Sequence, residues 1–248
     1  DELSEDAWRQ EMLCDFDAAI PGAIWGRELY QAEQEGRITG VEYDRYTDVF
    51  TAWDLGYSDD TSIWFYQVVH GEVHLIDYYA ASGKSIDHYA AQVLSKPYRY
   101  KTHYLPHDAR AKTLASGGKS VIEMLAEHLD IRKMAITPSL SMQDGIQAAR
   151  QMMPRVWFDR ERCSEGLEAL KQYQREWDED KKQFRDKPRH DWTSHASDAF
   201  RYVAINWREE VKPEELEDKP IRGLHVGQTE VTLNELWAAQ PTKQPKRI

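Results

Sequence analysis

The stretch VFTAWDLGYSDDTSIWFYQVVHGEVHLIDYYAAS, residues 49–82, decides the fold of this chain. It contains runs rich in β-branched and aromatic residues at 49–56, 61–69 and 73–82, separated by short polar segments. Turns this short cannot form a parallel crossover, which needs roughly a dozen residues or more. The stretch therefore predicts a meander of three antiparallel strands.

After this meander, helical and strand patterns alternate along the chain. Alternation of this kind favours parallel pairing, so we expect a mixed α/β sheet, with three antiparallel strands followed by parallel strands, flanked by helices. The expected strands cover 100–108, 134–139 and 155–159; the expected helices cover 85–95, 121–129 (after a capping box at Ser120), 141–153, 163–180 and 192–207, with a basic loop at 181–190.

The chain divides into three regions by composition. Residues 1–48 carry helical patterns broken by Pro21 and Gly22, and we interpret them as a connecting region. Residues 49–208 hold the predicted sheet and its helices. Residues 209–248 are polar, with one short amphipathic segment at 231–239, and we interpret them as a tail.

Composition limits the classes of function. The 248 residues carry a formal net charge of −11, which argues against a protein that simply coats nucleic acid. Clustered carboxylates that hold cations would make the effective charge less negative. The two cysteines, Cys14 and Cys163, have no paired spacing, so a reducing cytoplasm fits better than a disulfide framework. No apolar run approaches the roughly 20 residues that span a bilayer.

Three aspartates fall at the ends of predicted elements. Asp54 ends the first strand, Asp108 ends the fourth, and Asp198 lies in the last helix. If the fourth strand pairs beside the first, Asp54 and Asp108 emerge side by side, and the last helix can bring Asp198 over them. Carboxylates that close must share protons or bind cations. Oxygen ligands suit Mg²⁺ or Mn²⁺, and two such ions would promote phosphodiester hydrolysis.

Other readings of these acidic positions stay open. Asp198 has Arg201 at i+3, so a salt bridge is an equal alternative to a metal ligand. Asp60 is either a fourth ligand or a turn residue. His195 either orients water or protonates a leaving oxygen, or it only packs. Asp191 is best explained as a helix N-cap.

Two groups of cations could contact DNA phosphates. Lys119 lies in GGKS, which is not an ATP-binding loop because Thr113 stands where that motif requires glycine. The first group is Arg110, Lys112 and Lys119, and the second group is Lys181, Lys182 and Arg185. For the second group, the alternative is a solvated loop.

Four segments together resemble one known family. WDLGYSDDTSIWF (53–65), LPHDAR (105–110), GIQAARQMMPRVWFD (145–159) and KPRHDWTSHASDAFRY (187–202) are similar, in order and spacing, to the C-terminal nuclease domain of the large terminase subunit of tailed double-stranded DNA bacteriophages. The similarity extends from about residue 24 to residue 207.

The resemblance implies an RNase H-like fold and a metal-dependent endonuclease that cuts concatemeric viral DNA, with little sequence specificity, in the host cell cytoplasm. It implies that Asp54, Asp108 and Asp198 bind metal and that Asp60 is an accessory acid. Residues 1–48 would link to an ATPase domain in cis, for which this chain has no Walker A motif. The implied partners are double-stranded DNA, the portal protein, which the tail would dock, and the small terminase subunit. Two alternatives remain: a DNA- or portal-docking module that is silent without its ATPase, and a related RNase H-like resolvase.

Overall fold

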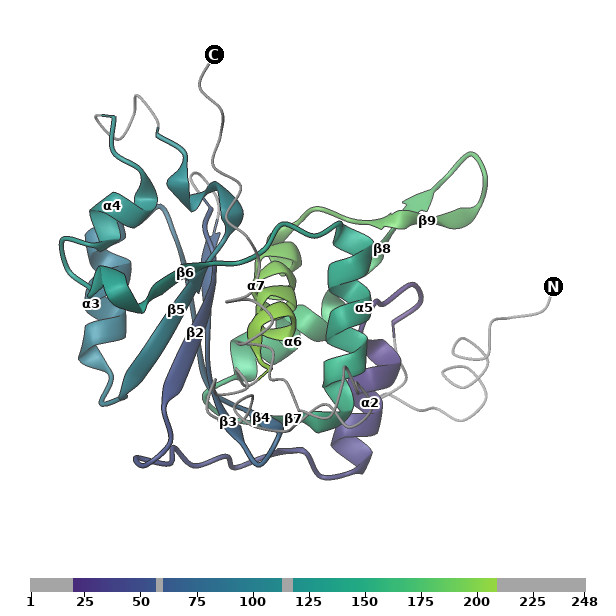
Figure 1. Cartoon of the computed structure of the whole chain (residues 1–248). Coiled ribbons are helices and arrows are strands. Elements are labelled where there is room, and N and C mark those ends of the chain that lie inside the picture. Colours follow the sequence, from purple (N-terminus) through teal and green to yellow (C-terminus); the bar gives the residue numbers. More distant parts are fainter. Residues whose placement is uncertain (1–19, 57–59, 113–117, 209–248) are drawn as a thin grey trace, which may run out of the picture. The chain divides into compact units, whose positions relative to one another are not determined.

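The fold is a mixed sheet between two groups of helices. The computed structural model describes residues 20–56, 60–112 and 118–208. Within these ranges, seven strands form one sheet in the order β1-β7-β4-β3-β2-β5-β6, and β8 and β9 form a separate hairpin. Figure 1 shows α3 and α4 on one face of the sheet and α2, α5, α6 and α7 on the other. This arrangement confirms the expected fold class.

The elements have the following bounds. The strands are β1 (Ile38–Thr39), β2 (Val49–Asp54), β3 (Asp60–Val69), β4 (Glu72–Ser82), β5 (Tyr100–Leu105), β6 (Met134–Ile136), β7 (Val156–Asp159), β8 (Arg175–Asp178) and β9 (Gln183–Pro188). The helices are α2 (Gly26–Gln34), α3 (Ile86–Ser95), α4 (Val121–Leu125), α5 (Met142–Met152), α6 (Ser164–Gln172) and α7 (Trp192–Asn206), with short 3-10 turns η1 (His107–Arg110), η2 (Ile131–Lys133) and η3 (Met153–Arg155).

The predicted meander is confirmed. β2 pairs antiparallel with β3, and β3 pairs antiparallel with β4. β5, the fourth predicted strand, pairs parallel with β2, the first, so the two lie side by side. The capping box at Ser120 is also present, although the α-helix that it starts ends at Leu125, earlier than expected.

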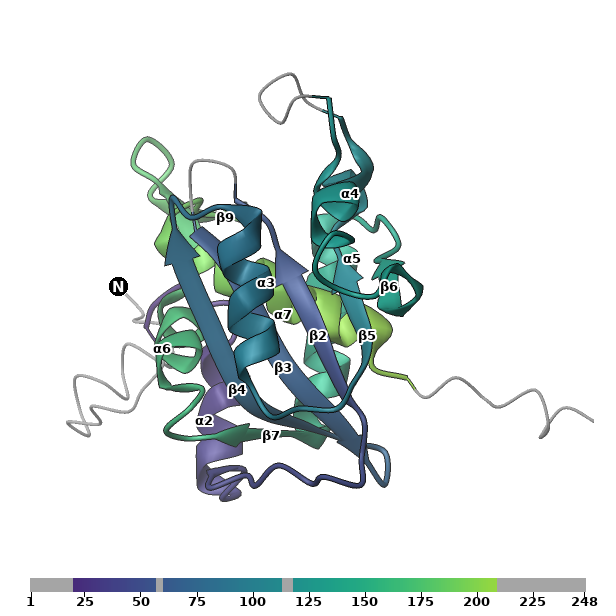
Figure 2. The ribbon, with the colours of Figure 1, turned by 90° about the vertical axis from the view of Figure 1, so that its left-hand side faces the viewer.

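Both faces of the central strand β3 are buried. Side chains alternate across a strand, so Ile63 and Phe65 enter the core under α3 and α4, whereas Trp64 and Tyr66 enter the core under α7. Figure 2 shows α3 lying across one face of the sheet, with α7 behind it. This double burial explains why the sequence of β3 is nearly continuously apolar.

Helix α7 is the element that carries candidate site residues onto the sheet. Asp191 caps it by accepting a hydrogen bond from the backbone N–H of Thr193, as predicted. Ala196 and Ala199 are buried, and the indole of Trp64 donates to the carbonyl of Ala196 at 2.9 Å. Trp192, in the first turn, is 50% exposed, so the packed apolar stripe of α7 begins one turn later, at Ala196.

The segment after α6 differs from the prediction. The expected helix over 163–180 ends at Gln172, and the chain then forms the β8–β9 hairpin, which includes most of the expected loop. Tyr173 is buried, and its carbonyl accepts from the backbone N–H of Ile24. The rings of Trp177 and Phe184 pack with centroids 4.9 Å apart. These long-range contacts override helical propensity in a charged segment that has no apolar stripe of its own.

Part of the predicted connecting region belongs to the folded unit. Residues 20–48 contribute α2 and β1; Trp25 and Leu29 are buried, and β1 pairs with β7. The predicted tail over 209–248, with its segment at 231–239, lies outside the described residues, as do residues 1–19. No helix in the described ranges is long and apolar enough to cross a membrane.

Candidate active site

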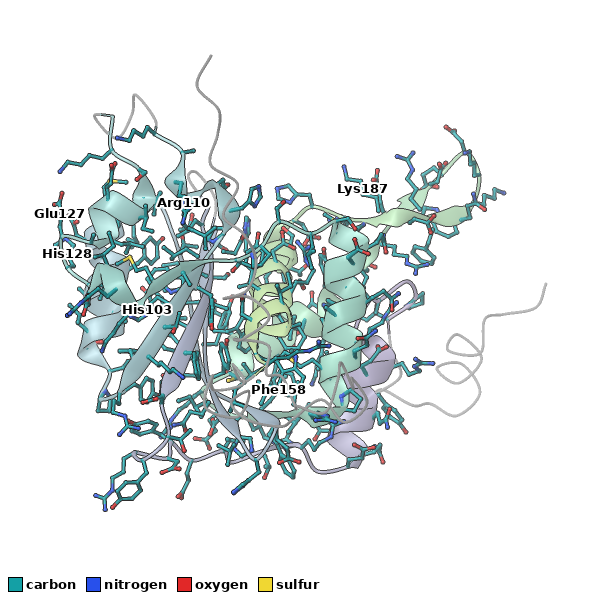
Figure 3. The ribbon with its side chains drawn as sticks, viewed as in Figure 1. His103, Arg110, Glu127, His128, Phe158 and Lys187 are labelled. Carbon is teal, nitrogen blue, oxygen red and sulfur yellow. The ribbon has the colours of Figure 1, made fainter. Side chains whose placement is uncertain are left out.

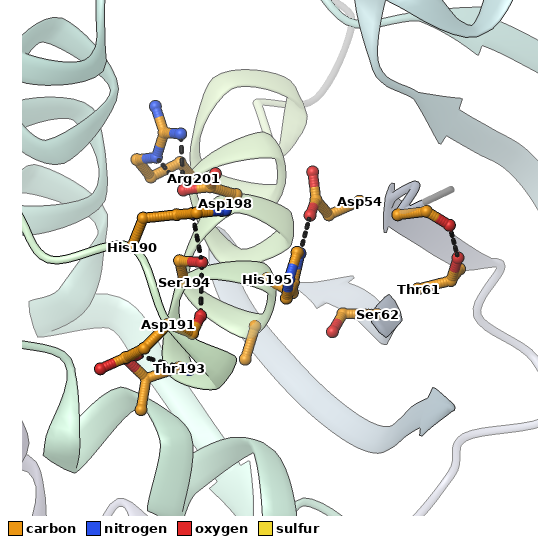
Figure 4. Close-up of polar contacts among 12 residues, drawn as sticks. Asp54, Thr61, Ser62, His190, Asp191, Thr193, Ser194, His195, Asp198 and Arg201 are labelled. Carbon is orange, nitrogen blue, oxygen red and sulfur yellow. Dashed lines mark hydrogen bonds and ion pairs between the residues drawn. The ribbon is translucent and has the colours of Figure 1, made fainter. Parts of the chain in front are cut away.

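Asp54 lies where β2 ends and faces α7. Its side chain is only 17% exposed, and its Oδ2 is 3.0 Å from Nδ1 of His195 (Figure 4). Burial raises the pKa of Asp54, the charge of Asp198 raises it further, and the hydrogen bond from His195 opposes both effects. A carboxylate in such surroundings is stabilised by a nearby cation.

Asp198 follows His195 by one turn of α7 and is already paired. Both Nε and Nη2 of Arg201 contact the same oxygen, Oδ1 of Asp198, at 3.2 and 2.7 Å. The i+3 salt bridge that the sequence allowed is therefore present. It does not exclude a second role for Asp198, because no hydrogen bond from the described residues reaches Oδ2.

Asp108 lies in η1 and not in strand β5, which ends at Leu105, so the predicted strand is three residues too long. Pro106 follows Leu105 and cannot donate to a strand ladder. Asp108 is exposed, yet it contributes to the same local field as the other acids. Burial raises the pKa of the Tyr202 phenol, and the charges of Asp54, Asp198 and Asp108 raise it further.

The charge of Asp198 acts on Asp54, and all three candidate acids act on Tyr202, but they do not form a closed set of ligands. Among the described residues, no group of three or more histidine, cysteine, aspartate or glutamate side chains could hold a metal ion as placed. The donor types nevertheless suit a hard divalent cation, since all are carboxylates and one is partly buried beside a second acid.

Asp60 begins β3, beside a second polar group. The Tyr78 phenol bonds to the Ser62 hydroxyl at 2.9 Å, and burial raises its pKa, as do the charges of Glu165, Asp60 and Asp54. Sequence reasoning missed Glu165 in the first turn of α6. Burial and the charge of Asp60 raise the pKa of this glutamate, whose only signal in the sequence was its place in a helical first turn.

The candidate DNA contacts near η1 differ in their availability. Arg110 is exposed two residues after Asp108 (Figure 3), and no ion pair involves it in the described part of the chain. Lys112 pairs with Glu123 at 3.1 Å, and Lys119 pairs with Glu127. Among these three cations, Lys112 and Lys119 are thus paired with acidic side chains and Arg110 is not, within the described part of the chain.

The second basic group lies on the β8–β9 hairpin, which projects from the body of the molecule (Figure 1). Lys181 and Lys182 are exposed in its turn. Arg185 contacts Glu176 and Asp178, each at 3.1 Å. The expected basic loop is therefore a hairpin in which acidic side chains neutralise part of the positive charge.

Comparison with known proteins identifies a matching family. The profile of the terminase RNaseH-like domain matches residues 51–203, more than half of the chain and the whole span from β2 into α7. No curated protein matches the sequence.

Solved structures share this fold at low sequence identity. The large terminase from the thermophilic bacteriophage D6E has a TM-score of 0.53 and 18% identity, over 70% of this chain and 43% of that one. The nuclease domain of the bacteriophage SPP1 large terminase, with bound Mn, has a TM-score of 0.51 and 15% identity, over 66% of this chain and 91% of that one. The P22 large terminase nuclease domain has a TM-score of 0.51 and 18% identity, covering 69% and 88%. This chain thus spans less than half of the D6E protein.

Proposed function

Because this chain belongs to the terminase RNase H-like domain family, we propose that it is a metal-dependent endonuclease that hydrolyses phosphodiester bonds in double-stranded DNA. The observation that carries the proposal is the position of Asp54, partly buried at the end of β2, against His195 and near Asp198 of α7. In this proposal, Asp54, Asp108 and Asp198 bind Mg²⁺ or Mn²⁺, two ions in all. The SPP1 nuclease domain, which shares the fold, has bound Mn.

The ions would lower the pKa of a bound water and neutralise charge on the phosphate. The protein's own residues supply the rest. Asp54 and Asp198 are held by His195 and Arg201, so their carboxylates are oriented before a ligand arrives. Asp60 is an accessory acid, and His195 acts as a positioning group for Asp54 that can also handle a proton near the reacting phosphate.

Contacts to DNA would come from cations beside the acids. Arg110 is the first candidate, and Lys181 and Lys182 on the hairpin are the next. Lys112, Lys119 and Arg185 already have acidic partners and would need to exchange them. Phosphate contacts carry no base code, so cleavage should have little sequence specificity.

The family supports one biological setting for this chain. We infer that the chain cuts concatemeric viral DNA during genome packaging in the host cytoplasm, with an ATPase domain in cis and with the portal protein and small terminase subunit as partners. This chain covers 43% of the D6E large terminase. The same protein was also solved in complex with ADP, and this chain covers 42% of it in that structure. That ligand supports a nucleotide-binding region elsewhere in a full-length protein.

A direct test is cleavage of supercoiled plasmid by the full 248-residue chain with Mn²⁺ or Mg²⁺. Nicked and linear products should appear, and EDTA should abolish them. Asp54→Asn and Asp108→Asn should each lower the rate at least 100-fold, whereas Asp87→Asn, an exposed acid of α3 paired with His128, should not. Cleavage that persists in EDTA would refute the proposal.

A second candidate function has one observation in its favour. The acids are not assembled into a metal-binding group within the described ranges. Such unassembled acids are expected of a docking module that binds DNA or the portal protein and cuts only when it is joined to its ATPase domain. DNA binding without cleavage in either metal, together with cleavage by a chain that includes the ATPase domain, would favour that reading.

A further inference from the structure

Arg201 is the most constrained cation near the candidate acids. Its side chain is 9% exposed and lies between α7 and α5. It directs two N–H groups at a single oxygen, Oδ1 of Asp198, at 3.2 and 2.7 Å. A guanidinium shared between both carboxylate oxygens would leave neither free. Here both contacts between Arg201 and Asp198 (Figure 4) go to Oδ1, and no hydrogen bond from a described residue reaches Oδ2, which is left for a ligand.

Helix α5 has a glycine, Gly145, where the Arg201 side chain packs against it. A Cβ added to Gly145 would lie 3.0 Å from Nη1 and 3.2 Å from Cδ of Arg201. Glycine is less favourable than alanine inside a helix, so its presence there calls for a reason. The close approach of Arg201 provides one, and this feature lies 56 residues away in the chain.

We propose that Arg201 is the positioning residue of Asp198: it holds Oδ1 so that Asp198 offers only Oδ2 to a divalent cation, and Gly145 provides the space that this requires. The inference rests on the proposed function, and it adds a specific limit. Asp198 acts as a one-oxygen ligand and cannot chelate an ion with both oxygens while Arg201 stays in place.

The charge of Arg201 makes the test decisive. Removing a cation beside carboxylates strengthens the binding of Mn²⁺ if electrostatics alone matters. Removing a positioning group weakens it, typically 10- to 100-fold for residues that orient metal ligands. The two explanations predict opposite signs for one substitution.

The experiment measures Mn²⁺ binding to the full chain, without DNA, by the electron paramagnetic resonance signal of free Mn²⁺. We expect about tenfold or greater weakening for Arg201→Gln and a smaller weakening for Arg201→Lys, which keeps the charge but has no fork. Gly145→Ala should weaken binding severalfold with the Arg201 charge unchanged. Arg150→Gln removes a different partly buried ion pair, between Arg150 of α5 and Glu28 of α2. It is the matched control and should lower the melting temperature only.

Each outcome has a clear meaning once circular dichroism shows that a variant is folded. Mn²⁺ affinity that is unchanged or increased in Arg201→Gln, while Asp198→Asn loses binding, overturns the positioning role and leaves the proposed function intact. Loss in Arg150→Gln equal to that in Arg201→Gln also overturns it, because helix packing would then be the cause. A wild-type chain that binds no Mn²⁺ refutes both proposals.

Discussion

The carboxylate of Asp54 and the imidazole of His195 are 141 residues apart in the chain and 3.0 Å apart in space. The contact joins the end of β2 to the second turn of α7, so the sheet and the helix meet at an acid that burial disfavours in its charged form. Stability and metal binding should therefore oppose each other at this position.

Asp54→Asn should stabilise the protein without metal. Burial, and also the charge of Asp198, raises the pKa of Asp54 above 3.8 in the folded protein, so folding favours the protonated carboxyl. Asp54 therefore contributes to the free energy of unfolding below about pH 4, and this contribution is lost as the pH rises through the folded pKa. Asparagine stays neutral, so the variant's melting temperature at pH 7 should exceed that of the wild type by about 2–4 °C. The difference should vanish near pH 3.5.

Asp198→Asn provides the contrast for that measurement. Its loss leaves the buried guanidinium of Arg201 without a charged partner, so scanning calorimetry of both variants should show Asp198→Asn destabilised by about 1–3 kcal/mol. Equal effects of the two substitutions would contradict the assignment of their environments.

His103 should make stability depend on pH in a second window. Its Nδ1 is 2.8 Å from the Thr51 hydroxyl, which also accepts from the Trp53 indole. Burial lowers the pKa of His103 to about 4 from 6.5. Between these values the unfolded chain binds a proton that the folded chain does not, so stability falls as the pH falls, by up to about 1.4 kcal/mol per pH unit.

The free energy of unfolding, measured with urea at several pH values, should change less between pH 6.5 and 4 in His103→Gln than in the wild type. The slope of this free energy against pH is the quantity to compare. His107→Gln, at an exposed histidine in the neighbouring turn, should keep the wild-type slope. Identical slopes in all three proteins would exclude His103 as the source.

Gly166→Ala should destabilise the packing of α6 on the sheet. A Cβ at this position would lie 2.4 Å from the Trp64 ring and 2.8 Å from the Tyr78 ring, both in the core. Overpacking costs about 1–3 kcal/mol, which exceeds the helix-propensity gain of alanine. Gly40→Ala is the matched control, because nothing lies within 4 Å of its Cβ. Chemical denaturation should separate the two variants.

Arg110→Ala should weaken DNA binding and reduce its salt dependence. Arg110 has no acidic partner among the described residues, so each phosphate that it contacts should contribute about 0.9 to the slope of log affinity against log salt. Arg27→Ala, at an exposed arginine of α2, should leave the slope unchanged. Fluorescence anisotropy with a labelled duplex at several salt concentrations measures both, and an unaltered slope in Arg110→Ala would remove it from the interface.

Local patterns in the sequence were sufficient for strands β2 to β7 of the sheet and for most helices, but not for the edge strand β1. The alternation in β2, β3 and β4, the short turns between them and the caps at Ser120 and Asp191 act over a few residues, so each can be read without knowing the partner. The same patterns placed Asp54 at a strand end and Asp198 in a helix, and this made them candidates for one site.

Only the tertiary structure decided how these side chains are used. Arg201 takes one oxygen of Asp198 because α5 presents Gly145 opposite it, and the β8–β9 hairpin forms because Tyr173 is buried and Trp177 meets Phe184. Lys112 is neutralised by Glu123, although its charge alone suggested a free cation. The physical reason is common to all of these: burial, packing and charge pairing depend on residues that are neighbours in space, and local periodicity carries no record of them.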